Sequence, residues 1–529
     1  MKFKHISVLP LISLIFLFLS FHHGAELTSS NAHARWDIIV PDDYATLQEA
    51  IDHAKPGYRI LIKEGIYKEN LVIDKPFILL CGKNKERTII DGGKTTKDTI
   101  RVKADGITLR NLTIRNGWSE NERLWDLAGI RIESSNVVVK NCIIKQNRLG
   151  INALTGCYNL TIENNTFIGD GILLANYVYS CKLDKKDFLH KIRNNTVNGK
   201  PLCYLANSRD LIVTGDVGQI ILANCTNVTI EGISLRGTDF PIILGYCSNC
   251  IIRNVTVMDN DGEIILLHSR GCILENNEAS GELHGICLDF LSEDNVVRYN
   301  VVHDNWVGIS VLSGSSYNLI CFNEVYNNAE GIAISSYCQH LGATKNILRD
   351  NWISRNNIGI IVGSGSNDNS IEKNFISSNR VGIIVKSSSD NLIMENIFVR
   401  NILSACFLNC SKNVWFKNYW NRPRLLPKLI PGCRRLGYLV VPWINVDPSP
   451  LKSVPYELRI NLYKLPERPV ISFFNFWREA ASWQFVHAEM IPYAFTAFPL
   501  LVTRLISART SRLVLFQITR FHCHAPPIA

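Results

Sequence analysis

Four titratable residues on two successive repeats, Asp259, Asp261, Glu282 and His284, are the strongest candidates for chemistry in this sequence. If the repeats stack, these side chains lie near one another. Carboxylates on adjacent coils can divide the acid and base roles of glycoside hydrolysis, or bind a Ca²⁺ ion that neutralises an acidic sugar. We therefore predict these four as catalytic residues. The alternative is a solvated polar turn whose carboxylates only accept hydrogen bonds.

Four further residues are candidates for substrate binding. Asp304 and Trp306 come one repeat later, where the indole ring can stack on a sugar. Trp118 and Trp125 lie in a charged insertion, and inserted loops of repeat proteins often build the binding face. For this second pair, a loop that simply packs against the repeats is the alternative.

These residues need a scaffold, and a short apolar motif that begins and ends with Asn indicates one. Its copy Asn136-Val-Val-Val-Lys-Asn141 is followed 23 residues later by a copy that starts at Asn159. A second apolar strand follows a glycine in phase with this motif. Its copies begin at Gly285, Gly308, Gly331, Gly359 and Gly382.

A period of about 22–24 residues with two or three short strands is typical of a solenoid. No coil can bury its apolar face alone, so the coils stack at about 4.8 Å and align equivalent side chains in columns. The Leu-x-x-Leu-x-Leu frame of leucine-rich repeats is absent. We therefore predict an all-β, single-stranded parallel β-helix.

The recurring Asn and Cys residues have a structural interpretation. Asn tolerates left-handed backbone at corners and bonds along its own column. Cys157, Cys225 and Cys247 each lie two residues before such an Asn, and Cys410 lies three before one. This spacing predicts a column of small buried thiols. Cys225 and Cys247 lie on neighbouring coils, so a bridge between them in an oxidising compartment is the alternative.

Both ends of the chain differ from the repeats. Lys2 and Lys4, the apolar stretch from Ile6 to Phe21 and Ala32-His33-Ala34 predict a cleaved signal peptide, with an uncleaved anchor as the alternative. A helix predicted over 43–54 caps the first coils. The predicted regions are 1–34 for the signal, 35–100 for the cap and first coils, 101–420 for the repeats, 421–465 for a C-terminal cap and 466–529 for an irregular tail of uncertain role.

The composition and charge of the chain limit the classes of partner that we expect it to bind. The apolar fraction of 46% excludes global disorder, and the net charge of +9 over 529 residues is mild and forms no dense basic run. We expect no nucleic-acid binding. A polysaccharide or surface glycan is the expected partner, and membrane contact is expected only through the N-terminal segment if it stays uncleaved. The expected location is secreted, periplasmic or cell-surface.

Several motifs resemble a known family. The segments Ile39-Val-Pro-Asp-Asp-Tyr and Gly65-Ile-Tyr-Lys-Glu-Asn resemble the opening of pectin-lyase-like right-handed parallel β-helix proteins. The segments Asn195-Thr-Val-Asn-Gly-Lys-Pro-Leu and Lys417-Asn-Tyr-Trp-Asn are similar to the NosD-type branch. The resemblance covers about residues 36–445 and implies carbohydrate-binding and sugar-hydrolysis repeats. Its namesake is a periplasmic protein linked to copper-site maturation.

The catalytic signatures of related enzymes are missing from the sequence. It has no Trp-Ile-Asp-His motif as in pectate lyases and no Asp-Pro-His-Glu motif as in alginate epimerases, and its 13 His are scattered. The first hypothesis is therefore a non-catalytic carbohydrate-binding protein. The alternatives are a polysaccharide lyase or glycoside hydrolase, and a NosD-like copper-site accessory protein. The sequence singles out no set of metal ligands, and Ca²⁺ is the one cofactor that the acidic cluster suits.

Overall fold

The computed structural model describes residues 4–7, 36–120, 126–176, 181–338, 341–436 and 439–453. Contacts divide the chain into one unit of residues 1–433 and 443–468, and a second unit of 434–442 and 469–529. The first unit holds a parallel β-solenoid of about 17 turns. The predicted signal peptide, apart from residues 4–7, and the predicted tail lie outside the described residues.

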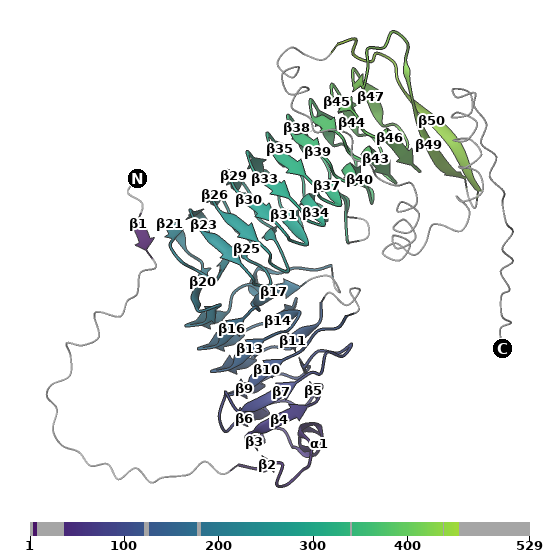
Figure 1. The fold of residues 1–529 in the computed structure, drawn as a ribbon. Helices are drawn as coiled ribbons and strands as arrows, with labels where there is room; N and C mark the ends of the chain where they lie inside the picture. Colours follow the sequence, from purple (N-terminus) through teal and green to yellow (C-terminus); the bar gives the residue numbers. More distant parts are fainter. Residues whose placement is uncertain are drawn as a thin grey trace, which may run out of the picture. The chain divides into compact units, whose positions relative to one another are not determined.

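An N-terminal segment of the solenoid is built from three parallel sheets (Figure 1). Sheet 1 contains β2 (Ile38–Val40), β3 (Arg59–Ile62), β6 (Leu79–Gly82), β9 (Thr108–Arg110), β12 (Val138–Lys140), β15 (Thr161–Glu163) and β18 (Lys191–Arg193). Sheet 2 contains β4 (Gly65–Lys68), β7 (Thr88–Asp91), β10 (Thr113–Arg115), β13 (Ile143–Lys145), β16 (Thr166–Ile168) and β19 (Thr196–Val197). Sheet 3 contains β5 (Leu71–Ile73), β8 (Ile100–Val102), β11 (Ala128–Ile132), β14 (Leu149–Leu154) and β17 (Ile172–Asn176).

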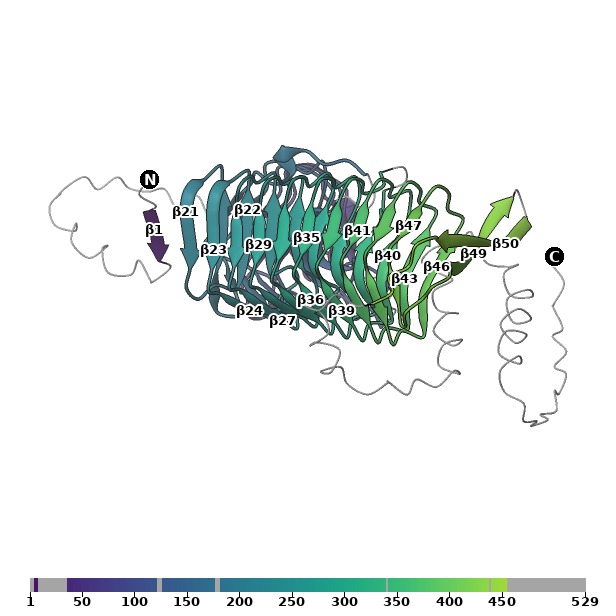
Figure 2. The same cartoon turned by 90° about the horizontal axis from the view of Figure 1, so that it is seen from above.

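A C-terminal segment continues with three more sheets, whose strands lie side by side in chain order (Figure 2). Sheet 4 contains β1 (Lys4–Ser7), β21 (Arg209–Thr214), β23 (Thr226–Glu231), β26 (Ile251–Arg253), β29 (Ile273–Glu275), β32 (Val296–Arg298), β35 (Leu319–Cys321), β38 (Ile347–Arg349), β41 (Ser370–Glu372), β44 (Leu392–Met394) and β47 (Val414–Phe416).

Sheet 5 contains β20 (Lys200–Ala206), β22 (Gln219–Ala223), β25 (Ile242–Gly245), β28 (Ile264–Leu267), β31 (His284–Asp289), β34 (Val307–Val311), β37 (Glu330–Ile334), β40 (Ile358–Val362), β43 (Val381–Lys386), β46 (Leu403–Leu408) and β49 (Lys428–Leu436). Sheet 6 contains β24 (Ser234–Arg236), β27 (Thr256–Met258), β30 (Glu278–Ser280), β33 (Val301–His303), β36 (Glu324–Tyr326), β39 (Trp352–Ser354), β42 (Phe375–Ser377), β45 (Ile397–Val399) and β48 (Tyr419–Trp420). Strand β50 (Leu439–Asp447) follows β49.

The predicted N-terminal cap is a helix, α1 (Leu47–His53), which is shorter than the predicted 43–54. Thr46 caps it, because its hydroxyl accepts the Glu49 N–H while the Glu49 side chain accepts the Thr46 N–H. Leu47, Ala50 and Ile51 are buried, so the apolar face of α1 covers the core of the first coils.

The coils stack in register, as the repeat predicted. Ile309 pairs with Ile332, Ile332 with Ile360 and Ile360 with Ile383, all in neighbouring strands of sheet 5. These side chains are fully buried inside the C-terminal segment. Each of these isoleucines is therefore buried against its counterparts on the coils above and below it.

Asn ladders hold the corners. Asn318 Nδ2 donates to Asn346 Oδ1 at 2.9 Å, and Asn346 Nδ2 donates to Asn369 Oδ1 at 3.1 Å on the next coil. All three are buried, which confirms the structural interpretation of these Asn residues. Another ladder ends at Asp447, which accepts from Asn418 Nδ2 and Trp420 Nε1 at 3.1 and 3.0 Å.

The predicted column of small buried residues is also present. Cys225, Cys247 and Cys410 are buried free thiols, and the bridge considered between Cys225 and Cys247 is not formed. Serine takes the same place on other coils, where the hydroxyl of Ser269 accepts the Cys247 N–H at 3.0 Å. A thiol and a hydroxyl are thus interchangeable small groups in this column.

The two segments of the solenoid are joined by one β-hairpin and by side chains that take the place of further strand pairing. Strand β19 pairs antiparallel with β20, and this hairpin leads from one segment to the other. The Gln219 amide donates to Ile172 O and accepts from Ile172 N, at 2.8 and 3.0 Å. Asp239 accepts the N–H groups of Gly150 and Gly171 at 2.6 and 2.8 Å. These contacts satisfy backbone N–H and C=O groups at the end of sheet 3 that no further strand pairs with.

One disulfide, between Cys181 and Cys338, also joins the segments across 157 residues of sequence. Both cysteines lie in loops outside the strands. Among the described residues, no helix is long and apolar enough to cross a membrane.

Candidate functional site

The structure divides the four predicted catalytic residues. Glu282 and His284 are buried, whereas Asp259 is exposed and Asp261 is half-buried. Asp259 pairs with Arg236 at 2.6 Å, and Asp261 pairs with Arg148 of the N-terminal segment at 2.8 Å. The pairing of Asp261 therefore contributes to the junction of the segments.

Asp259 and Glu282 do not occupy equivalent positions on their two coils. Asn260, not Asp259, lies on the coil beside Glu282 and donates its Nδ2 to Glu282 Oε1 at 2.9 Å. An alignment of the two coils by Gly262 and Gly285 would pair Asp259 with Glu282. The strands instead align by their buried isoleucines, so that Ile264 pairs with Ile286. Glu282 thereby takes the place of an Asn in a corner ladder, and its N–H donates to Asn305 Oδ1.

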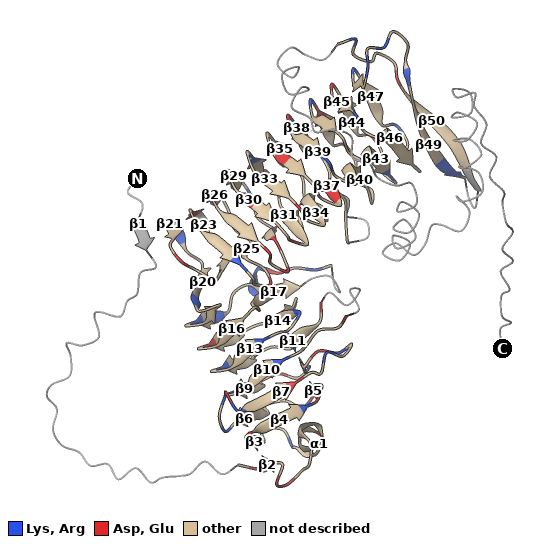
Figure 3. Cartoon of the chain, in the orientation of Figure 1, with Lys and Arg blue, Asp and Glu red and all other residues tan. Residues whose placement is uncertain are grey.

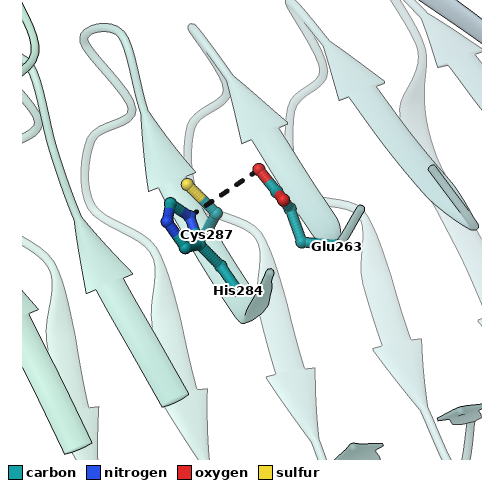
Figure 4. A group of neighbouring side chains, drawn as sticks. All are labelled: Glu263, His284 and Cys287. Carbon is teal, nitrogen blue, oxygen red and sulfur yellow. Dashed lines mark ion pairs between the residues drawn. The ribbon is translucent and has the colours of Figure 1, made fainter. Parts of the chain in front are cut away.

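A compact group of Glu263, His284 and Cys287 lies on the outer face of sheet 5 (Figure 4). Glu263 directly precedes β28, and the other two belong to the neighbouring strand β31. His284 Nδ1 lies 3.8 Å from Glu263 Oε1, and the possible ligand atoms of all three lie within 4.8 Å of one another. Their side chains are almost fully buried.

Two more residues orient the imidazole. Tyr337 Oη lies 3.1 Å from His284 Nε2, and the two rings are stacked with an interplanar angle of 13°. Ser310 Oγ, on the next strand of sheet 5, lies 3.3 Å from His284 Nδ1. Because Tyr337 precedes Cys338, the disulfide to Cys181 fixes the chain beside this ring.

Burial governs the protonation of this group. It raises the pKa of Glu263 and of Glu282 to about 8 each, and the nearby Glu282 carboxyl adds to the shift of Glu263. Burial also lowers the pKa of His284 to about 4. At neutral pH the imidazole is therefore uncharged, and its ring nitrogens can act as a hydrogen-bond acceptor or a metal ligand.

The sequence did not predict Glu263 and Cys287 as part of a site. Strict strand alternation places His284 and Cys287 on opposite faces, because three positions separate them. A Cβ on Gly285 would meet the core side chain of Val302 at 2.5 Å, and the neighbouring Ile286 is buried in the core as well. Because Gly285 and Ile286 both face the core, His284 and Cys287 lie on the same outer face of the sheet. The irregular glycine was the signal that could have revealed this.

An exposed face of different character lies at the corner where sheet 6 leads to sheet 5. Trp306 is 55% exposed and follows β33 of the coil that stacks on Glu282. The Trp306 N–H donates to the Glu282 carbonyl at 3.1 Å. On the same corner, Asp304 Oδ2 lies 2.7 Å from His303 Nδ1. Asp304 and Trp306 thus lie two positions apart at the same corner.

Aromatic and cationic groups extend this face along sheet 6. The His303 ring stacks on Tyr326 of the next coil at 4.9 Å between centroids, and the Arg355 guanidinium lies 4.8 Å from the Tyr326 ring centre. Glu278 Oε1 lies 3.3 Å from His303 Nε2. We call Glu278, His303, Asp304, Trp306, Tyr326 and Arg355 the corner face.

The second predicted Trp pair is on the N-terminal segment. Trp118 is half-buried, and the Lys94 ammonium lies 4.7 Å from its ring centre. This contact supports a packing role for Trp118. Trp125 lies outside the described residues. Asp126, beside it in sequence, is buried and binds Arg131 at 3.0 Å.

Family comparisons agree with this architecture. The family described as "Right handed beta helix region" matches residues 80–218 and 306–420, and "Periplasmic copper-binding protein (NosD)" matches residues 188–341. These matches, together with the parallel solenoid, support a pectin-lyase-like right-handed parallel β-helix family for this chain. The NosD match includes both the corner residues around Trp306 and the group of Glu263, His284 and Cys287.

Individual relatives match more distantly. Probable pectinesterase/pectinesterase inhibitor 17 and probable pectinesterase 67, both from Arabidopsis thaliana, are 36% identical over 84 residues and 31% identical over 102 residues. These stretches cover 14% and 17% of this chain, and only 16% and 30% of the relatives.

Similar solved structures include two enzymes. The A-module of the mannuronan C-5 epimerase AlgE6 from Azotobacter vinelandii is 16% identical with a TM-score of 0.34, over 70% of this chain and 88% of that one. An exopolygalacturonase from Thermotoga maritima is 12% identical with a TM-score of 0.30, over 68% and 84%.

Proposed function

We propose that this chain is an exported β-helix protein that binds polysaccharide on the corner face, with Trp306 as the stacking residue. The proposal retains the predicted roles of Asp304 and Trp306. It rests on one observation above the others, the large exposed indole at a corner where the fold does not require it.

Neighbouring coils support this reading of Trp306. The same corner position carries Ala329 on the next coil and Asn357 on the one after, as the backbone hydrogen bonds from coil to coil align them. A small or polar residue is thus sufficient to build the corner. An exposed Trp at such a position is available to stack on the apolar face of a sugar ring.

Other polar groups of the corner face suit a sugar as well. Asp304 and Glu278 offer acceptors for hydroxyl groups, and Arg355 offers a planar donor for an acidic sugar. Stacking and hydrogen bonding together are the usual basis of carbohydrate recognition. Positive and negative charges are interspersed along the described strands (Figure 3), so no single charged sheet dominates the molecule.

The test is a glycan array, followed by calorimetry with the strongest ligand and the variant W306A. We expect W306A to weaken binding by at least tenfold, because truncation of an aromatic hot-spot residue costs about 2 kcal/mol or more. The matched control is Y317A, since Tyr317 is 54% exposed on a different corner of the same segment. Equal affinity of W306A and the unaltered chain would exclude this face.

Product analysis separates binding from catalysis. New reducing or unsaturated ends during incubation with pectin or alginate, lost in E282Q, would favour the lyase or hydrolase alternative. We expect intact polysaccharide, because the Glu282 carboxyl is buried and already accepts a ladder hydrogen bond from Asn260. The export of the chain is part of the proposal and rests on the predicted signal.

A further inference from the structure

We propose that Glu263, His284 and Cys287 bind a divalent transition-metal ion of the zinc and copper class. The proposal goes beyond glycan binding, because none of the three residues belongs to the corner face. It is carried by the geometry of the three side chains, by an unpartnered carboxylate oxygen and by the groups that orient the imidazole.

The ligand atoms are already close to the spacing of a metal site. In a tetrahedral zinc site with bonds of about 2.0–2.3 Å, the ligand atoms lie about 3.3–3.8 Å apart. His284 Nδ1 and Glu263 Oε1 are separated by 3.8 Å, and no pair among the three possible ligand atoms exceeds 4.8 Å. A tetrahedral site would require these separations to shorten by at most about 1.5 Å.

The second observation is an orphan oxygen. Glu263 is only 5% exposed, and its Oε2 atom has no hydrogen-bond partner among the described residues. A buried carboxyl oxygen without a partner is costly, and a bound cation that displaces the proton of this carboxyl is one way to satisfy it. Glu282 Oε2, close to the same group, is likewise without a partner in the described part of the chain.

The imidazole is held as metal-binding histidines usually are. A ligating His commonly donates the N–H of its other ring nitrogen to an oxygen, which fixes the tautomer and the ring orientation. Tyr337 Oη lies 3.1 Å from Nε2 and can accept this proton, which leaves the Nδ1 lone pair toward Glu263 and Cys287. Ser310 Oγ lies 3.3 Å from Nδ1, so the ion would replace this hydroxyl as the partner of the Nδ1 lone pair.

The donor set selects the class of ion. Thiolate and imidazole suit zinc and copper, whereas Ca²⁺ requires six to eight oxygen ligands. The three residues offer a carboxylate, an imidazole nitrogen and a sulfur. The Ca²⁺ that the sequence suggested for the acidic residues is therefore not the ion expected at this group.

The test uses the full chain, freed of metal with a chelator and dialysed against Zn²⁺, Cu²⁺ or Co²⁺. We expect one ion per chain by elemental analysis, and a thiolate-to-metal absorption band with Co²⁺ or Cu²⁺. C287S should lose this band, and E263Q should weaken binding at least a hundredfold. Y337F, which acts only through His284, should weaken binding by about tenfold. Whether Zn²⁺ or Cu²⁺ is retained in competition distinguishes the two ions.

The control is C406S, because Cys406 occupies the same outward column of sheet 5 several coils away. Pairs along the sheet lead from Cys287 through Ser310, Ala333, Ile361 and Ile384 to Cys406. C406S should bind metal like the unaltered chain, and thermal melts of each variant without metal check folding. Retention of less than half an equivalent of every ion by the unaltered chain, or full binding by E263Q and C287S, would overturn the proposal. These results would not affect glycan binding at Trp306.

Discussion

Asp170 is a carboxylic acid in a place where the corners of the solenoid usually carry an amide. It is fully buried, and Asn147 donates both its N–H and its Nδ2 to the two carboxyl oxygens at 3.1 and 2.6 Å. Asn165 makes the same two bonds to an amide, that of Asn195. Burial raises the pKa of Asp170 to about 7, against about 3.9 in an unfolded chain.

The raised pKa has a defined effect on stability. The protonated form is the stable one in the fold, so its contribution is complete below about pH 4 and is lost as the pH rises through 7. We expect D170N to flatten the fall in melting temperature between pH 5 and pH 8, and to stabilise the chain by about 2 kcal/mol at pH 8. Calorimetric melts across this range provide the measurement, and parallel curves for both proteins would contradict it.

At the scale of single residues, some members of the candidate sites could be predicted from the sequence and others could not, for physical reasons. Trp306 could be predicted as exposed because its indole breaks the pattern of its column. Glu263 and Cys287 could not, because their meeting with His284 depends on a break in strand alternation at Gly285. The catalytic role assigned to Asp259, Asp261, Glu282 and His284 stays a prediction.

At the scale of elements, the ladders make the corners the most sensitive part of the repeat. Asn346 is fully buried and links Asn318 to Asn369, and its Nδ2 also reaches Ser315 O at 3.0 Å. We expect N346A to destabilise the chain by about 2–3 kcal/mol, because it leaves buried groups on two coils unpaired.

Denaturant unfolding would measure this effect. The control is N357A, since Asn357 is a half-buried corner residue outside the ladders. A similar small loss for both variants would mean that the ladder contributes no more than an ordinary surface amide.

The strands themselves followed from the sequence, because an apolar period of 22–23 residues leaves few alternatives to stacked coils. The register of β28 did not follow. Gly262 lies two residues before the aligned Ile264, whereas Gly285 lies one residue before Ile286, so glycine is an unreliable marker on that coil. The aligned isoleucines set the register because they fill the core.

At the scale of the whole unit of residues 1–433 and 443–468, the two solenoid segments depend on contacts that no repeat encodes. The disulfide between Cys181 and Cys338 could not be predicted, because both residues lie in loops and 157 positions separate them. Phe188 packs against Gly245 so closely that a Cβ there would lie 2.4 Å from the ring. Contacts of this kind are specific to the place where the two segments meet, and the repeat pattern does not encode them.

The disulfide should contribute strongly to stability, because it closes a long loop in the unfolded chain. We expect C181S/C338S to be less stable by about 3–5 kcal/mol in denaturant unfolding. The control is C203S/C321S, which removes two cysteines that are free in the structure. Equal losses for both double variants would show that the crosslink itself contributes nothing.

The crystal structure of the chain with the best oligosaccharide from the glycan array tests the central claim most directly. We predict a sugar ring stacked on the Trp306 indole, with hydroxyl groups bound by Asp304 or by a neighbour on sheet 6. A sugar bound on the N-terminal segment, with the Trp306 ring free, would contradict it.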